Sequence, residues 1–177
     1  MPRAHRSTRI TLRTADVAEA AKLHALIAEN LVEGHLLPRT LDELTIHAPR
    51  FVVAIRGRTL VGCAELATLS PQVAEVRSLV VDATARKHGV GTMLVDELRA
   101  RARREGFDKL CAFTHAPGYF MPMGFSIVPH LWIPEKIFTD CVKCPRFRQC
   151  GQYAMVQSLD AIVDSADRDV QIAARHV

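Results

Sequence analysis

Residues 75–106 combine a strand, a glycine-containing turn and a helix, and this stretch constrains the fold most strongly. The apolar run Val76–Val81 has the length and the β-branched content of a strand. After a polar turn, apolar residues recur every four positions and share one helical face: Val90, Leu94, Leu98 and Ala102. Glu97 and Arg101 are spaced as a supporting ion pair, and Gly106 follows an arginine-rich last turn, where the helix is expected to end.

The turn before this helix, Arg86–Thr92, has the composition of an anion-binding site. Free backbone N–H groups at a helix N-terminus bind phosphate, and glycine lets the phosphate approach closely. A dinucleotide fingerprint needs a third glycine where Leu94 stands, and a nucleotide-hydrolysing loop needs lysine directly after Gly91, where the chain has Thr92. Both of these sites are therefore excluded by spacing, while a simple helix cap stays open as the alternative.

The spacing Arg86-x-x-Gly89-x-Gly91 after a strand resembles motif A of the GCN5-related N-acetyltransferases, whose loop binds the pyrophosphate of acetyl-coenzyme A (acetyl-CoA). The resemblance extends over residues 9–159 in element order. It implies an α+β fold with a mixed, mostly antiparallel sheet flanked by helices. It also implies that one segment holds the pantetheine arm and polarises the thioester carbonyl: Leu79, Val80 and Val81. A second segment would hold the pyrophosphate: Arg86, Lys87, His88, Gly89, Val90, Gly91 and Thr92.

Three longer segments resemble the short bacterial N-acetylglutamate synthases of arginine biosynthesis: residues 34–39 (GHLLPR), 74–81 (AEVRSLVV) and 134–138 (PEKIF) with Asp140-Cys141-x-x-Cys144-Pro145. This narrower resemblance implies acetyl transfer from acetyl-CoA to the α-amino group of L-glutamate. Both substrates would bind together, and the amine would attack the thioester directly. The resemblance also implies that the arginine-binding regulatory domain of the longer synthases is missing. The acceptors left open are glutamine, another amino acid and a protein N-terminus.

Strand alternation predicts that Glu75, Arg77, Leu79 and Val81 point to one face of the strand. A carboxylate on that face suits a general base, because an amine nucleophile must lose a proton around the time of attack. Arg77 suits a two-point clamp on a substrate carboxylate, which lysine would provide less well. The alternative is that Glu75 and Arg77 form a surface ion pair on an edge strand.

The other candidate residues follow from the resemblance. Many relatives use a tyrosine four residues before a Gly-Phe pair to protonate the leaving thiolate, but Phe120 holds that position here. Tyr119 and Thr114 are therefore both candidates for the acid, and His115 is a further one. The matched segments also supply candidate substrate-binding residues: Ser78, Arg39 and Lys136. The alternative for the two cations is that they are solvated loop residues.

Cys141, Cys144 and Cys150 have the spacing C-x₂-C-x₅-C, which contains half of a structural zinc site. Zinc requires four ligands, so a residue such as His130 would have to complete the set. The alternative is a thiol-bearing loop near the acceptor pocket that responds to redox conditions. Two further cysteines, Cys63 and Cys111, lie in apolar strand patterns and are expected to be buried thiols.

The remaining elements are expected from periodicity and turn residues. The expected strands are residues 9–13, 51–55, 60–68, 109–114, 126–128 and 153–159. A helix is expected from Val17, with its apolar face at Ala21, Leu23, Ile27 and Leu31, and Thr40 is expected to cap a brief helix over residues 41–46. A helical turn is expected at 119–123 and a cysteine-bearing insertion up to Gly151. Antiparallel strands followed by this strand–helix unit predict one α+β domain at residues 9–159.

Length, charge and cysteine usage limit the setting and the partners. The chain has 177 residues, and residues 1–8 are expected to be a flexible tail. Residues 160–177 are expected to be either a frayed tail or an amphipathic helix against a partner subunit, so a homodimer stays open. No apolar run reaches membrane-spanning length, and an odd number of cysteines without a secretion signal favours the cytoplasm. The net charge is +4, but aromatic residues make up only 6%, which disfavours a zinc-knuckle protein that binds nucleic acid.

Overall fold

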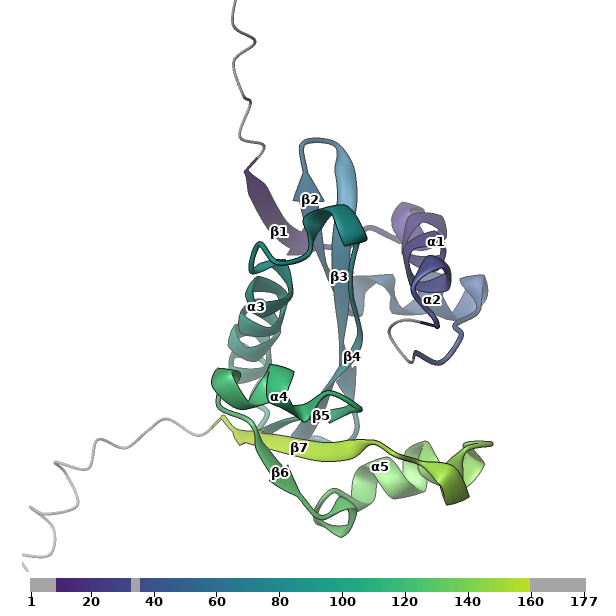
Figure 1. The fold of residues 1–177 in the computed structure, drawn as a ribbon, viewed down its shortest axis with the longest axis vertical. Helices are drawn as coiled ribbons and strands as arrows, with labels where there is room; N and C mark the ends of the chain where they lie inside the picture. Colours follow the sequence, from purple (N-terminus) through teal and green to yellow (C-terminus); the bar gives the residue numbers. More distant parts are fainter. Residues whose placement is uncertain (1–8, 33–35, 160–177) are drawn as a thin grey trace, which may run out of the picture.

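The computed structural model describes residues 9–32 and 36–159. Seven strands form one sheet in the order β1-β2-β3-β4-β5-β7-β6 (Figure 1). All neighbouring strands are antiparallel except β4 and β5, which are parallel. The strand bounds are β1 Ile10–Thr14, β2 Phe51–Arg56, β3 Thr59–Thr68, β4 Val73–Val81, β5 Lys109–Thr114, β6 Ser126–Val128 and β7 Tyr153–Ser158. The expected α+β fold with a mixed, mostly antiparallel sheet is confirmed.

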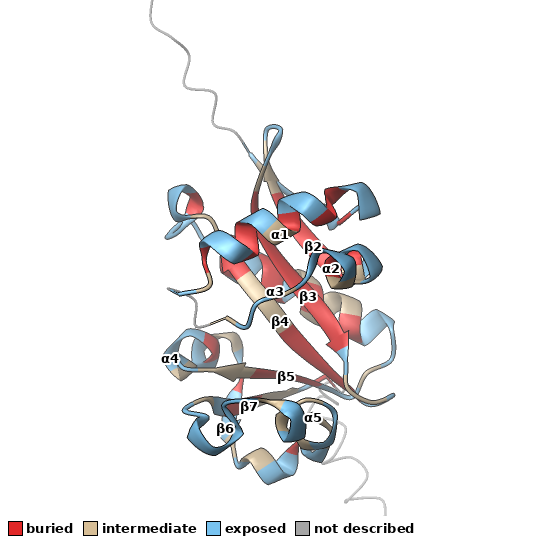
Figure 2. Cartoon of the chain, turned by 90° about the vertical axis from the view of Figure 1, so that its right-hand side faces the viewer, coloured by how far each residue is buried: buried red, intermediate tan, exposed pale blue. Residues whose placement is uncertain are grey.

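Helices cover both faces of the sheet (Figure 1). The α-helices are α1 Ala20–Glu29, α2 Leu41–His47, α3 Val90–Arg104, α4 Pro117–Phe120 and α5 Pro134–Thr139. One face packs on α3 through its buried leucines and alanine, and the other packs on α1 and α2. Figure 2 shows the result, with buried residues concentrated along the central strands between the helices.

The first helical segment begins with a capping box. Asp16 accepts a hydrogen bond from the Ala18 N–H, and the Glu19 carboxylate accepts one from the Asp16 N–H. The first turn, Val17–Glu19, is a 3-10 helix, and only then does α1 begin. The expected face is confirmed at Leu23 and Ile27, which are buried, and Leu31 packs partly buried against the same core. Ala21 is exposed, whereas the buried residues of α1 are Ala20, Leu23, Leu26 and Ile27.

The expected face of α3 is confirmed, because the four apolar residues spaced by four are all buried. The expected ion pair between Glu97 and Arg101 is wrong. Arg101 pairs with Glu105 at 2.6 Å, and Glu97 pairs with Arg104 at 3.0 Å. Gly106 follows the helix with a φ of +84°, a conformation that favours glycine, so the expected end is confirmed.

Strand β4 contains a β-bulge that contradicts the expected alternation. Arg77 pairs with Glu65 of β3 and Val80 pairs with Cys63, so two β4 residues stand opposite the single residue Ala64. Ser78, the first of the two, has a φ of +47°. The extra residue reverses the faces along the rest of the strand. Val80 packs on the α1–α2 side, while Leu79 and Val81 pack on the α3 side and do not share a face with Glu75 and Arg77.

Residues 129–152 insert between β6 and β7 and carry α5. Ile133 anchors this insertion, because its buried side chain packs with Cys111 and Val73 of the sheet. In the described ranges no helix is long and apolar enough to cross a membrane. Both terminal segments, residues 1–8 and 160–177, and the matched pair Gly34-His35 lie outside the described residues.

Candidate active site

A cavity of about 610 Å³ lies where β4 and β5 separate. In the described chain these parallel strands pair only from Val73–Val76 on β4 to Lys109–Ala112 on β5. Beyond this point β5 continues to pair with β7, and β4 with β3, so a wedge opens between them. The expected cofactor or catalytic residues that line the cavity are Leu79, Val80, Val81, Arg86, Lys87, Gly89, Val90, Gly91, Thr92, Thr114 and Tyr119. Ser78, expected to bind substrate, lines it as well.

The glycine turn forms one end of this cavity. Gly89 caps α3 with a φ of +75°, which leaves the first backbone N–H groups of the helix pointing towards the turn. Lys87 also has a positive φ, +63°. Two conformations of this kind close together produce the tight turn that an anion site at a helix start requires. His88 does not line the cavity, and its Nδ1 lies 2.7 Å from the carbonyl oxygen of Arg86.

The Arg86 side chain forms hydrogen bonds with two other residues that line the cavity. Its Nε donates to the carbonyl oxygen of Val81 at 3.0 Å, and one terminal nitrogen donates to Oδ1 of Asn30 at 2.6 Å. Asn30 is buried at the end of α1 and donates to the carbonyl oxygen of Leu26. These contacts fix a guanidinium beside the turn, so the wall carries positive charge where an anion would lie.

Tyr119 reaches the glycine turn from α4. An atom at the Cβ position of Gly91 would lie only 2.1 Å from the Tyr119 hydroxyl oxygen, so this glycine leaves space for the tyrosine. Burial raises the pKa of the Tyr119 phenol, and a hydrogen bond with Thr92 acts in the opposite direction. Thr114 lies at the end of β5, and its hydroxyl accepts from the Ala116 N–H at 3.0 Å. His115 follows it and also lines the cavity.

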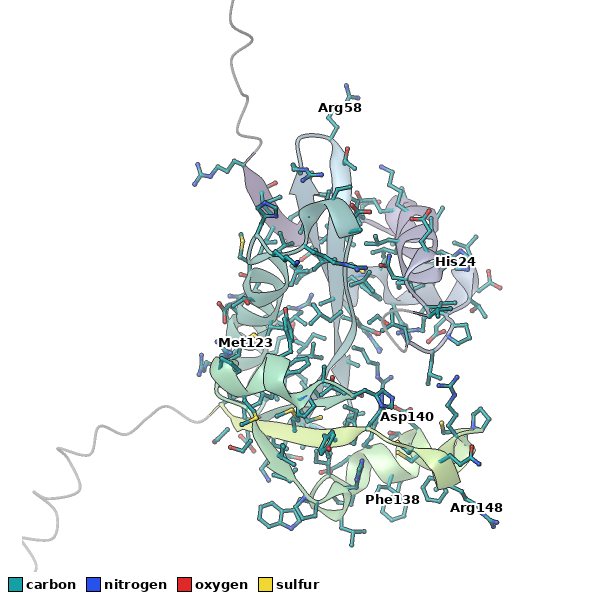
Figure 3. All side chains as sticks on the ribbon, in the orientation of Figure 1. His24, Arg58, Met123, Phe138, Asp140 and Arg148 are labelled. Carbon is teal, nitrogen blue, oxygen red and sulfur yellow. The ribbon has the colours of Figure 1, made fainter. Side chains whose placement is uncertain are left out.

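Glu75, Arg77, Lys136 and Asp140 form a cluster of four charges, here called the α5 cluster. Lys136 Nζ lies 2.7 Å from Oε1 of Glu75 and 2.8 Å from Oδ2 of Asp140. Arg77 donates through Nε to Oε2 of Glu75 at 2.7 Å and through a terminal nitrogen to Oδ2 of Asp140. Figure 3 shows Asp140 between α5 and the sheet, whereas Phe138 and Arg148 point away from the domain.

The α5 cluster lies beside the cavity wall but does not line it. The expected alternative of a surface pair on an edge strand is wrong, because Glu75 is only 3% exposed and β4 is a central strand. Lys136 Nζ lies 5.2 Å from the centre of the Phe113 ring, and Phe113 lines the cavity. Arg77 precedes Ser78, another lining residue. Glu75 as the base, and Arg77 and Lys136 as carboxylate ligands, therefore stay predictions.

Arg39, a candidate substrate-binding residue, belongs to a second group of polar side chains with Glu43, His47, Glu65 and Ser78, here called the Arg39 cluster. Its side chain is only 8% exposed and does not line the cavity. One terminal nitrogen donates to Oε2 of Glu65 at 2.8 Å and to the Ser78 hydroxyl at 2.9 Å. The other lies 3.2 Å from Nδ1 of His47, and Nε lies 2.7 Å from Oε1 of Glu43. Glu65 itself is fully buried on β3.

The cysteines, all five of which belong to the described residues, are not part of the cavity lining. Cys63 and Cys111 are fully buried as expected, and burial raises the pKa of the Cys63 thiol to about 12 and raises that of Cys111 as well. Within residues 9–32 and 36–159 no group of three or more His, Cys, Asp or Glu side chains is arranged to hold a metal. Cys141, Cys144 and Cys150, even with His130, therefore do not come together as the zinc site that the cysteine spacing had left open.

Several residues of this site were not predicted from the sequence. Asn30 and Gln152 line the cavity, and Asp140 completes the α5 cluster. Two of them had a signal: Asn30 follows Leu23 and Ile27 at helical spacing, and Asp140 follows Lys136 by four positions. Gln152 had no such signal, because only the pairing of β7 with β5 brings it to the wedge.

Known proteins resemble this chain in sequence and in fold. The model of the acetyltransferase (GNAT) family matches residues 19–125, more than half of the chain. An uncharacterized N-acetyltransferase of Chlorobaculum tepidum is 31% identical over 148 residues, covering 84% of this chain and 96% of the relative. An amino-acid acetyltransferase of Pectobacterium carotovorum is 26% identical over 127 residues, and the match covers 71% of this chain but only 29% of that protein.

Solved structures share the fold. The N-acetylglutamate synthase of Neisseria gonorrhoeae, complexed with coenzyme A and N-acetyl-glutamate, has a TM-score of 0.78 at 24% identity. The match covers 88% of this chain and 36% of the synthase. A Mycobacterium tuberculosis protein in complex with CoA has a TM-score of 0.72 at 21% identity, with 84% of this chain and 98% of that one covered. The resemblance inferred from the glycine turn is confirmed: the chain belongs to the acetyltransferase (GNAT) family and is an N-acetyltransferase.

Proposed function

We propose that the protein transfers the acetyl group of acetyl-CoA to the α-amino group of an amino acid, and that this acceptor is L-glutamate. The reaction would be that of N-acetylglutamate synthases, which act in arginine biosynthesis, and we place it in the cytoplasm. Two kinds of observation support the proposal. Relatives named amino-acid acetyltransferases match 70–71% of this chain, and two cations beside the cavity converge on one carboxylate oxygen.

The cavity suits acetyl-CoA. Its glycine turn offers helix N–H groups, and Arg86 and Lys87 add positive charge for the pyrophosphate. Beyond Val76, β4 has no ladder with β5 in the described chain, so the backbone of Leu79–Val81 is available to a pantetheine arm. The arm would take the place of the missing strand partner.

The α5 cluster suits an acceptor carboxylate, and this observation carries the proposal. A terminal nitrogen of Arg77 and Nζ of Lys136 both contact Oδ2 of Asp140. Asp140 is the most exposed member of the cluster, with 37% of its side chain accessible. We propose that a carboxylate of the acceptor replaces Asp140 on these two donors, since the geometry already accommodates one carboxylate group.

The transfer itself needs four changes of bonding. The unprotonated amine attacks the thioester carbon, the C–S bond breaks, the amine nitrogen loses a proton, and the sulfur gains one. Glu75 is proposed to receive the amine proton through water, because its carboxylate accepts from Nε of Arg77, whose neighbour Ser78 lines the cavity. Tyr119 and Thr114 are the hydroxyl groups lining the cavity that were predicted as the acid, and both remain proposed. No cysteine lines the cavity, which favours direct attack over an acyl-cysteine intermediate.

The first experiment measures coenzyme A thiol release from acetyl-CoA with a panel of glutamate, glutamine, aspartate, lysine and a short peptide. We expect turnover with glutamate. Arg77→Lys should raise KM for glutamate about tenfold or more, because the planar guanidinium contacts Glu75 through Nε and offers a terminal nitrogen to the acceptor, and a single ammonium does not reproduce this geometry. KM for acetyl-CoA should stay unchanged, since Arg77 does not line the cavity.

Arg58→Lys is the matched control, because Arg58 lies at the tip of the β2–β3 hairpin far from the cavity (Figure 3). Thermal melts of both variants would show whether each is folded. Turnover with glutamine or the peptide but not with glutamate would reject the named acceptor and keep the acetyltransferase. An unchanged glutamate KM in Arg77→Lys would reject Arg77 as the carboxylate ligand.

A further inference from the structure

The backbone of Ser78 has a conformation that non-glycine residues rarely adopt. Its φ is +47°, and among the described non-glycine residues only Lys87 also has a positive φ. For an L-residue this conformation is disfavoured by about tenfold in population, because Cβ approaches the backbone. Something must therefore hold Ser78 in this state. The position matters, since Ser78 begins the bulge that reverses the faces of β4.

The Arg39 cluster provides that restraint. The Ser78 hydroxyl accepts a hydrogen bond of 2.9 Å from a terminal nitrogen of Arg39, and the same nitrogen donates to Glu65 at 2.8 Å. Arg39 cannot easily move, because Glu43 and His47 engage its other nitrogens and its Cζ lies over the Phe51 ring, 6.0 Å from the ring centre. A buried, charge-assisted contact of this kind is stronger than a neutral hydrogen bond.

We propose that Arg39 is a positioning residue, and that it acts by fixing the Ser78 hydroxyl and with it the β4 bulge. The bulge in turn sets the segment Leu79–Val81 as the cavity wall. This role differs from binding the acceptor, which the sequence suggested for both Arg39 and Ser78. It rests on the proposed function, because the wall is assigned to acetyl-CoA.

Substitutions at Ser78 separate the two roles. Both Ser78→Ala and Ser78→Gly remove the hydroxyl. Alanine is still strained at the positive φ of this position, whereas glycine adopts a positive φ without strain. If the hydroxyl serves the backbone, Ser78→Gly should bind coenzyme A about tenfold more tightly than Ser78→Ala, as measured by calorimetry. If the hydroxyl contacts a substrate, the two variants should be equally impaired, and this outcome would overturn the proposal.

A variant at the other partner tests the connection. Arg39→Lys keeps a positive charge for buried Glu65 but loses the planar group that reaches Ser78 and His47. It should weaken coenzyme A binding, and the double variant Arg39→Lys/Ser78→Gly should recover most of that loss. If Arg39 binds the acceptor instead, Arg39→Lys should raise only the acceptor KM, and Ser78→Gly should not restore it.

Hydrogen exchange of residues 76–82 in the absence of ligand makes the test independent of the proposed function. Exchange in this segment should be faster in Ser78→Ala and in Arg39→Lys than in the wild type, and Ser78→Gly should slow it again in the double variant. Equal exchange in all the proteins would reject the restraint. Failure of the wild type to bind coenzyme A, with the exchange differences intact, would reject the proposed function and not the restraint.

Discussion

Gly89 caps α3 and Gly91 lies in its first turn, and a side chain would be disfavoured at each position for a different reason. At Gly89 a Cβ would have no neighbour within 4 Å, but the φ of +75° strains any other residue. At Gly91 the backbone is helical, and a Cβ would lie 2.1 Å from the Tyr119 hydroxyl. The first glycine is needed for the shape of the chain, and the second for the space in the cavity.

This difference predicts opposite phenotypes for two alanine substitutions. Gly89→Ala should lower the free energy of unfolding by about 1 kcal/mol, because alanine is strained at positive φ. Gly91→Ala should leave that free energy close to the wild-type value and weaken coenzyme A binding about tenfold or more, because the added methyl group intrudes on the cavity wall. Urea unfolding and calorimetry measure the two effects. Equal coenzyme A affinity in the two variants would contradict the assignment of Gly91.

At the scale of the element, the first helical segment depends on one ion pair at its start. Arg13 on β1 donates to both oxygens of Glu19 at 2.7 and 2.8 Å, and Glu19 also completes the capping box. The hydrogen bond from Arg13 is the main reason why the pKa of Glu19 is lowered from 4.5 to about 2. The pair therefore links the edge strand of the sheet to the helix that follows it.

This lowered pKa predicts a pH dependence of stability. A carboxyl group with a folded pKa below its unfolded value stabilises the fold above about pH 4.5 and loses this contribution as the pH falls towards 2. A double-mutant cycle of Arg13→Gln and Glu19→Gln should give a coupling energy of about 1 kcal/mol or less at pH 6. Urea unfolding at lower pH should show the coupling decrease towards zero by about pH 2. A coupling energy independent of pH would contradict the pairing.

At the scale of the whole molecule, the α5 cluster joins residues that are far apart in the chain. Glu75 and Lys136 are separated by 61 positions, and their contact fixes the insertion 129–152 against β4. The rest of the insertion has little apolar anchorage besides Ile133, since many of its large apolar side chains are exposed: Leu131, Trp132, Phe138, Val142 and Phe147. Electrostatic contacts therefore carry much of the docking of α5. The homodimer that the sequence left open stays a prediction.

Removing one charge from the cluster should loosen the insertion. Asp140→Asn leaves Arg77 and Lys136 with Glu75 as their remaining partner in the cluster, so hydrogen exchange over residues 134–149 should become about fivefold faster. Exchange in α3 should not change. Glu135→Gln is the matched control, because it removes the same charge from α5 but lies outside the cluster. Equal exchange in the two variants would contradict the role of Asp140 in docking.

Most strands, the buried face of α3 and the glycine turn were predictable from the sequence because they depend on local chemistry, whereas α5 within the insertion was not predicted. The spacing of Val90, Leu94, Leu98 and Ala102 set the buried face of α3, and the glycine pattern located one end of the cavity. Alternation failed at Ser78, because a bulge depends on the register with β3 and not on the strand's own residues. The sequence also did not predict the charged partners. Arg39 contacts Glu65, and Arg77 contacts Asp140, only once the sheet and the insertion have folded. Tertiary structure decided which cations are buried in pairs, because long-range contacts are fixed by packing and leave no periodic signal.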